Sequence, residues 1–185
     1  MTGGIHAKRT LSKIALDPVG SSMRPCCMSK FWPKLILSVV VVMVLGAAGG
    51  FVTAGSIPDW YAKLAKPPGT PPNAVFGPVW SVLYLMIGIS LARVWHFVPA
   101  GPEKRRALIR FVIQMILNLI WTPLFFGAHL VAVALAVIVS LWVMILLTIL
   151  AFKPLDRVAA WLLMPYLTWV SYATYLNAGF FVLNR

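Results

Sequence analysis

Acidic residues are scarce in this chain of 185 residues. It has only four, Asp17, Asp59, Glu103 and Asp156, and none lies within an apolar segment. Ion-coupled transporters, proton relays and voltage sensors need ionisable side chains inside the membrane. Enzymes built on paired carboxylates or on a Ser-His-Asp arrangement also need acids at a site. The sequence therefore disfavours both classes.

Cysteine is equally rare. Cys26 and Cys27 are adjacent, in a polar N-terminal stretch. Adjacent thiols lack the spacing of a disulfide framework or a zinc site, so we expect no bound metal. We interpret the pair as incidental thiols or as juxtamembrane cysteines open to acylation. A redox role is the less favoured alternative.

Apolar residues, in contrast, make up 61% of the chain, and the mean hydropathy is +0.88. Five apolar segments are each long enough to cross about 30 Å of hydrocarbon as a helix. Open sheet edges cannot be satisfied in lipid. The sequence therefore predicts an all-α integral membrane bundle of five transmembrane helices, at residues 35–54, 75–97, 107–127, 129–151 and 158–183.

The formal net charge of +12 is unevenly distributed along the chain. Of the 16 Lys and Arg residues, all but Lys63, Lys66 and Arg185 belong to the N-terminal side or to the second and fourth connections. The positive-inside rule therefore predicts a cytoplasmic N-terminus and an external C-terminus. Residues 1–34 are interpreted as a basic, flexible segment, and residues 35–185 as the membrane domain. The expected partner is the lipid bilayer, because a nucleic-acid partner would need a basic folded domain.

Aromatic and amide side chains recur at helical spacing in three segments, which places each group on one helix face. They are Trp80 and Tyr84 in the second segment, Asn118, Trp121 and Phe125 in the third, and Trp169, Ala173 and Asn177 in the fifth. An amide deep in hydrocarbon usually faces the bundle interior and finds a partner there. The three stripes therefore favour a pocket, and core packing alone is the alternative.

The stretch AKPPGTPPNAVFGPVW, residues 65–80, holds five prolines between the first two segments. Proline fixes φ near −65°, so this loop loses little entropy when it covers a ligand, and we interpret it as a lid. Asn73 is expected to cap the next helix. Aromatic faces, with Lys63 and Lys66 as possible carboxylate partners, suit a planar apolar acid such as a tetrapyrrole.

Proline and glycine also mark the segments themselves. Pro123 and Pro165 each remove a helical hydrogen bond, so we expect kinks there. Gly46 and Gly50, four residues apart, would admit either a neighbouring helix or a flat ligand close to the backbone. The fourth segment, residues 129–151, is apolar all round and is predicted to face lipid as a scaffold.

Three stretches carry a resemblance to a known family: WYAKLAKPPGTPPNAVFGPVWSVLYLMIGIS, NLIWTPLFFG and DRVAAWLLMPYLTWVSYATYLNAGFFVLN. Together they resemble the TspO/MBR family, the tryptophan-rich sensory proteins whose animal relatives are the translocator proteins or peripheral benzodiazepine receptors. The resemblance spans about residues 35–184. It implies a five-helix bundle, usually a homodimer, that binds porphyrins, haem-type tetrapyrroles and, in several members, isoquinoline carboxamides and cholesterol beneath the first loop.

The family's ligand-binding positions fall on eight residues of this chain, namely Tyr61, Pro71, Trp80, Tyr84, Asn118, Trp121, Trp169 and Ala173. The resemblance implies a receptor or carrier in tetrapyrrole sensing, transport or regulation, with no required cofactor and no enzymatic activity. The uneven charge favours a bacterial inner membrane, although the family also occupies outer membranes of bacteria and mitochondria. Some relatives promote light-dependent porphyrin breakdown with tryptophans that match Trp80 and Trp169, so a porphyrin-degrading catalyst is one alternative. A membrane scaffold is the other. Ala178 stands near the tyrosine of the animal cholesterol motif, so sterol is not the predicted ligand.

Overall fold

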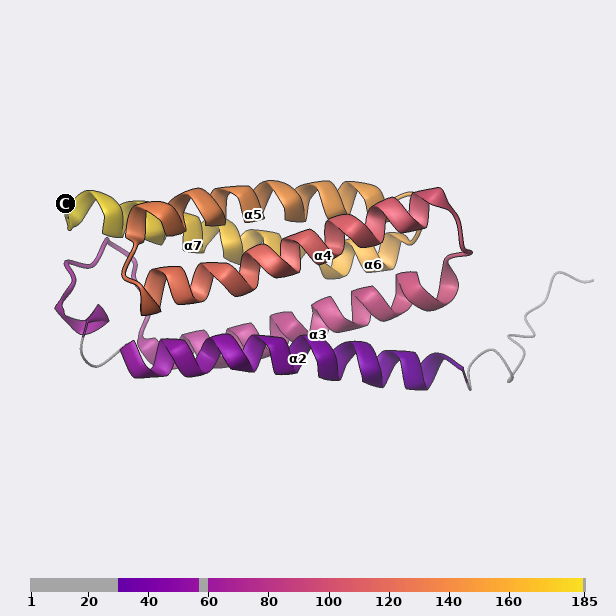
Figure 1. The fold of residues 1–185 in the computed structure, drawn as a ribbon, viewed down its shortest axis with the longest axis horizontal. Helices are drawn as coiled ribbons and strands as arrows, with labels where there is room; N and C mark the ends of the chain where they lie inside the picture. The colour runs from indigo at the N-terminus through magenta and orange to yellow at the C-terminus, as the bar shows by residue number, and fades with distance from the viewer. Residues whose placement is uncertain (1–29, 57–59, 185) are drawn as a thin grey trace, which may run out of the picture.

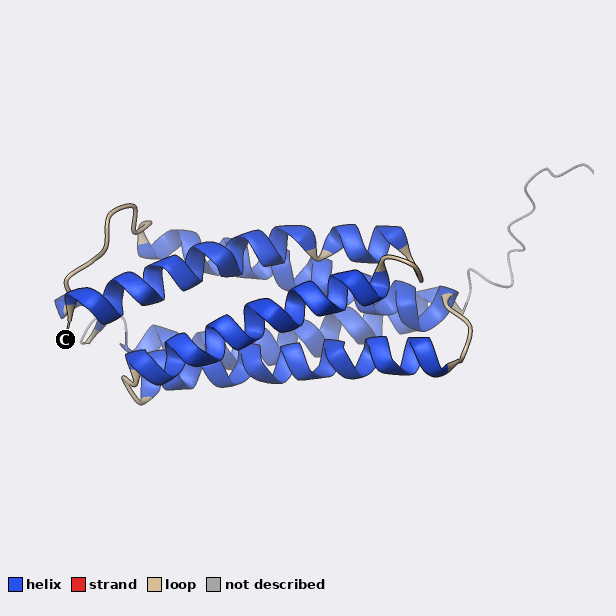
Figure 2. Ribbon diagram, turned by 90° about the horizontal axis from the view of Figure 1, so that it is seen from above, coloured by secondary structure: helices blue, strands red, loops and turns tan. Residues whose placement is uncertain are grey.

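The computed structural model describes residues 30–56 and 60–184, and every regular element in these ranges is helical (Figures 1 and 2). The α-helices are α2 (Phe31–Ser56), α3 (Asn73–Phe97), α4 (Pro102–Thr122), α5 (Val131–Phe152), α6 (Arg157–Leu162) and α7 (Met164–Leu183). A short 3-10 helix, η1 (Tyr61–Lys63), precedes α3, and a π-helical turn, η2 (Pro123–Gly127), follows α4. The predicted all-α class is confirmed.

Four helices in the described ranges are long and apolar enough to cross a membrane: α2, α3, α4 together with η2, and α5. The fifth predicted segment is divided, because α6 ends at Leu162 and α7 begins at Met164. Pro165 has no amide hydrogen to continue the helical ladder. The Leu163 N–H instead bonds to the carbonyls of Ala160 and Trp161. A kink is predicted at Pro165; the structure instead has two helices separated at Leu163, with Pro165 in the first turn of α7.

Two helices begin several residues earlier than the apolar segments predicted for them. The first segment is predicted to begin at residue 35, but α2 begins at Phe31. The third is predicted to begin at residue 107, but α4 begins at Pro102. Polar and aromatic residues at a membrane interface can continue a helix beyond its hydrocarbon portion. The prediction that Asn73 caps α3 is wrong, because Pro72 occupies the cap position and no side-chain cap forms. Cys26 and Cys27 lie outside the described residues.

The helices close into a ring in the order α2, α3, α6 with α7, α5 and α4. Lipid tails are as apolar as the helix surfaces, so close van der Waals packing must hold such helices together. At Gly88, α3 approaches the backbone of α2, and an added Cβ would lie only 2.7 Å from Val39 Cα. Small residues therefore set the separation of the first two helices.

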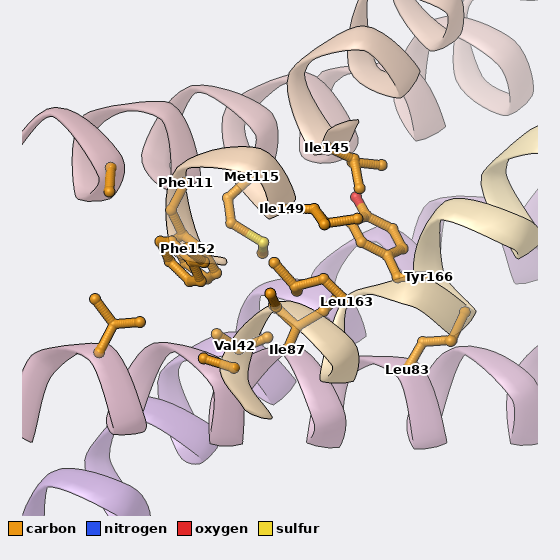
Figure 3. Packing of buried hydrophobic residues seen from close by; sticks show 14 of the residues in the cluster. Val42, Leu83, Ile87, Phe111, Met115, Ile145, Ile149, Phe152, Leu163 and Tyr166 are labelled. Atoms are coloured by element: carbon orange, nitrogen blue, oxygen red, sulfur yellow. The ribbon is translucent and has the colours of Figure 1, made fainter. Parts of the chain in front are cut away.

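Apolar side chains from several helices meet inside the ring (Figure 3). Phe111 of α4 stacks on Phe152 of α5, with ring centroids 6.1 Å apart. The prediction that the fourth segment faces lipid all round is wrong for one face, since Ile138, Leu141 and Ile145 of α5 are buried. An all-apolar helix gives no pattern to distinguish its buried side from its lipid side.

The two ends of the bundle differ in charge. The α3–α4 and α5–α6 connections lie at the same end as the start of α2, whereas residues 60–72, η2 and the end of α7 lie at the other, the loop end (Figure 1). We call the first the basic end. It includes Arg93, whose guanidinium pairs with Asp156 at 3.1 Å. Asp156 also accepts the Ala159 N–H and so caps α6.

Candidate functional site

A cavity of about 350 Å³ lies toward the loop end, between α2, α3, α7 and the junction of α4 with η2. Its size falls within the range of small-molecule sites, about 300–1,000 Å³. Six of the eight predicted ligand-binding residues line it, namely Tyr61, Trp80, Tyr84, Trp121, Trp169 and Ala173. The structure therefore brings the three sequence stripes to one interior.

Asn118 lies behind the cavity wall, outside the lining. It is 2% exposed, accepts a hydrogen bond from the Tyr84 hydroxyl at 3.0 Å, and donates one to the Tyr166 hydroxyl at 3.0 Å. Both ends of its amide are thus engaged by phenols, one on α3 and one on α7. The prediction that this amide finds an interior partner is confirmed, and the contact fixes the position of the Tyr84 ring.

Asn177 supports the wall in the same way. Its Oδ1 accepts the Trp121 indole N–H at 3.1 Å, and its Nδ2 donates to the Val131 carbonyl at 3.0 Å. One buried amide therefore links α4, α5 and α7 and sets the orientation of Trp121. Polar contacts of this kind are the usual means by which membrane helices fix one another's rotation.

The α2 side of the cavity is made of small residues. The Tyr84 ring lies directly against Gly46, where an added Cβ would overlap the ring. At Gly50 an added Cβ would meet no atom within 4 Å among the described residues. Close approach of a neighbouring helix, one of the two alternatives, is therefore confirmed at Gly46, while Gly50 leaves open space beside the cavity.

Aromatic rings form the opposite walls. Trp80 stacks on Tyr84, with ring centroids 5.2 Å apart, and Phe76 meets Trp169 edge to face at 6.1 Å. Among the described residues, the buried Trp169 Nε1 has no hydrogen-bond acceptor. Buried indole N–H groups usually find one. The cavity thus offers flat apolar surfaces, and one of its lining tryptophans has a buried N–H group without an acceptor among the described residues.

Pro123 shapes the loop-end wall. It begins the π-helical turn η2, in which the Ala128 N–H reaches the Pro123 carbonyl at 2.8 Å. The turn leaves Phe125 stacked on Trp121 and places Phe126 in the cavity lining. Sequence reasoning missed Phe126, because a regular α-helix would rotate it away from the stripe. It also missed Phe76, which the i, i+4 spacing to Trp80 could have revealed.

The proline loop is fastened to α7. The hydroxyl of Tyr172 donates to the Gly69 carbonyl at 2.5 Å, and that of Tyr175 to the Pro68 carbonyl at 3.1 Å. Pro67 rests against Gly179, where a Cβ would have no room. The loop is therefore anchored to α7 at three places.

Tyr61 is the loop's contribution to the cavity lining, and Pro71 lies outside it. Tyr61 is buried, which raises its pKa to about 12, so its phenol stays neutral at physiological pH. Lys63 and Lys66 are exposed and also lie outside the lining. The Lys66 ammonium lies 5.3 Å from the centroid of the Tyr61 ring. The structure thus links Lys66 to the cavity through Tyr61 alone.

The arrangement suits binding by stacking and burial. The described residues include no cluster of three His, Cys, Asp or Glu side chains that could hold a metal. Offset and edge-to-face rings contribute about 0.5–1.5 kcal/mol per pair beyond their burial. A flat, apolar molecule would gain most from such walls.

Comparison with known proteins agrees with this architecture. A sequence model of the TspO/MBR family matches residues 38–183. The tryptophan-rich protein TspO of Chlorobaculum tepidum is 39% identical over 157 residues, which are 85% of this chain and 99% of that protein. Protein CrtK of Rhodobacter capsulatus is 35% identical over 139 residues, 75% of this chain and 85% of that protein.

The match extends to animal proteins. The translocator protein of Bos taurus is 34% identical over 141 residues, which cover 72% of this chain and 82% of that protein. The family match and the apolar helices together identify an integral membrane protein. This chain belongs to the TspO/MBR family.

Proposed function

We propose that the protein binds a tetrapyrrole, such as protoporphyrin or haem, in the cavity between α2, α3 and α7, and acts as a receptor or carrier in tetrapyrrole sensing, transport or regulation. The observation that carries this proposal is the wall of three tryptophans, Trp80, Trp121 and Trp169, facing a glycine-lined stretch of α2. Rings on one side and bare backbone on the other suit a wide, flat ligand.

Two features of the cavity fit such a ligand. Gly50 leaves space beside the backbone that a side chain would fill. The Trp169 ring, which meets Phe76 edge to face at 6.1 Å, adds a flat apolar surface for the ligand to contact. Ligand carboxylates would extend toward the loop end, where Lys63 and Lys66 provide exposed cations. The protein needs no other cofactor for this role.

The membrane arrangement is part of the proposal. We propose that α6 and α7 together cross the membrane as a fifth span, because α7 packs beside α5 as a member of the ring. The cations gathered at the basic end favour a cytoplasmic N-terminus. The homodimer comes from the family resemblance, and the bacterial inner membrane from the uneven distribution of charge.

A second candidate function is light-dependent porphyrin breakdown. It is favoured by one observation, that Trp80 and Trp169 both line the cavity and would both contact a bound porphyrin. We regard binding without catalysis as the better supported function, because the described lining has no acid, base or metal-ligand cluster.

Titration of the purified protein with protoporphyrin in detergent, followed by porphyrin absorbance in the dark, tests the proposal. Trp80→Phe and Trp169→Phe should each weaken binding by about two- to tenfold, because each loses part of a stacking surface. Trp142→Phe is the matched control, since Trp142 of α5 lies outside the lining and donates to Ser171.

Each alternative predicts a different result. Unchanged affinity in both cavity variants would contradict the cavity as the binding site. Absence of saturable binding by the unmodified protein would favour a scaffold. Porphyrin absorbance that is lost only under illumination, and retained in the tryptophan variants, would favour the catalyst.

A further inference from the structure

A second hollow region lies on the outer surface of the bundle toward the basic end, away from the ligand cavity. One apolar slot of about 370 Å³ lies between α2, α3 and α4. A shallower depression of about 570 Å³ runs along α4 and the connection before it. Leu108 and Val112 line both, so the two adjoin each other. We call the combined feature the basic-end groove.

The deep part of the groove is apolar. Val41 and Leu45 form its α2 side, and Met115 and Ile116 its α4 side. Among the helices of the ring, α2 and α4 pack only lightly against each other. The slot therefore marks the seam of the ring, where a hydrocarbon chain can lie between two helices at little cost.

The outer part of the groove is also mainly apolar, but two cationic residues are among those that line it. They are Lys104 and Arg105, at the first turn of α4. The Lys104 ammonium donates to the carbonyls of Trp95 and Val98, at 2.8 and 2.7 Å, which fixes it where α3 ends. Lys34 of α2 lies over the Trp95 ring, 5.5 Å from its centroid. Cations from two helices thus surround one interfacial tryptophan.

Few acids offset these cations. Asp156 is paired with Arg93, which leaves the exposed Glu103 as the other acid at this end among the described residues. A bare cationic patch beside an apolar slot matches one kind of molecule, an amphiphile with an anionic head and an acyl tail. A second copy of this chain would instead bring a like-charged end against it.

We propose that the basic-end groove binds one anionic phospholipid, with its phosphate held by Lys34, Lys104 and Arg105 and one acyl chain in the slot between α2 and α4. Trp95 lies at the level where head group and chain join, the depth that tryptophan favours in a bilayer. The site is independent of the tetrapyrrole cavity, so it stands whether or not that ligand binds.

Native mass spectrometry of the full-length protein tests the proposal. The protein is released from detergent containing equal amounts of phosphatidylglycerol and phosphatidylcholine with the same acyl chains. The unmodified protein should retain one phosphatidylglycerol in preference. The double variant Lys34→Gln/Arg105→Gln should reduce that preference by about fivefold for each cation removed. Lys104 is left intact because it bonds the end of α3.

A charge-matched control uses the loop end. Lys63→Gln/Lys66→Gln removes the same charge from two exposed residues far along the chain from the groove. It should leave the preference unchanged. Equal retention of both lipids by the unmodified protein, or an equal loss in this control, would overturn the proposal.

A third variant tests the slot without changing charge. Val112 is 54% exposed, so Val112→Trp should fold and partly fill the groove, reducing retention of the bound phosphatidylglycerol. If this variant instead shifts the ratio of monomer to dimer and leaves lipid retention unchanged, the groove is a contact between copies of the chain, and the lipid proposal fails.

Discussion

At the scale of single residues, the cavity depends on which side chains have room and which are already engaged. Gly46 and Gly50 lie one turn apart on α2, yet only the first is in contact with a neighbouring helix. Asn118 has the depth and spacing of a ligand-binding residue, but two tyrosine hydroxyls occupy its amide. The sequence predicted the stripe correctly and could not show which of its members were free.

The two glycines provide a matched pair of substitutions. Gly46→Ala should push the Tyr84 ring, strain its hydrogen bond to Asn118, and destabilise the fold by about 1–3 kcal/mol, the usual cost of overpacking. Gly50→Ala should fit and stabilise α2 by about 0.5–1 kcal/mol. Thermal unfolding in detergent measures both. Equal melting temperatures for the two variants would contradict the close contact at Gly46.

At the scale of elements, proline acts in three different ways. Pro165 separates α6 from α7, and Pro123 opens a π-helical turn that brings Phe126 into the lining. Pro67, in the loop, packs on Gly179 of α7. Proline positions predicted where helices are interrupted, but the form of each interruption depended on the carbonyls and side chains nearby.

The attachment of the proline loop to α7 can be tested at Asn184, the residue that follows α7. Asn184 accepts the Ala65 N–H at 2.9 Å and donates to the Ala65 carbonyl at 3.1 Å. Asn184→Ala should remove both bonds, worth about 1 kcal/mol each, and speed amide exchange at Ala65 several-fold. Hydrogen exchange read by mass spectrometry measures this. Asn73→Ala, an exposed loop-end asparagine without a capping bond, is the control and should leave exchange at Ala65 unchanged.

At the scale of the whole molecule, the distribution of charge bears on orientation in the membrane, and the packing of the helices determines where a groove forms. The α3–α4 connection and the α5–α6 connection lie at the same end of the bundle (Figure 1), so Lys104 and Lys153 belong to one end. Such an asymmetry orients a membrane protein, because cytoplasmic loops retain Lys and Arg. The light contact between α2 and α4 leaves the groove at the same end.

One set of fusions can measure both the orientation of the protein in the membrane and whether α6 and α7 cross the membrane. Alkaline phosphatase fused after Arg185 should be active in a bacterial host, and a fluorescent protein at the same place should be dark, because five spans and a cytoplasmic N-terminus put the C-terminus outside. Fusions after Lys153 should show the reverse. A fluorescent C-terminal fusion would mean that α6 and α7 do not cross the membrane.

The sequence by itself determined the helical class, the uneven charge, the proline interruptions and the face of each helix that carries the aromatic stripe. Hydrophobic length, charge position and 3.6-residue periodicity are local properties of a chain, and they can be read along it. Only the tertiary structure decided that Asn118 supports Tyr84, that Phe126 completes the cavity, that α5 buries one face, and that α2 and α4 leave a groove. Periodicity selects a face of a helix, but the partner of that face follows from how all the helices pack.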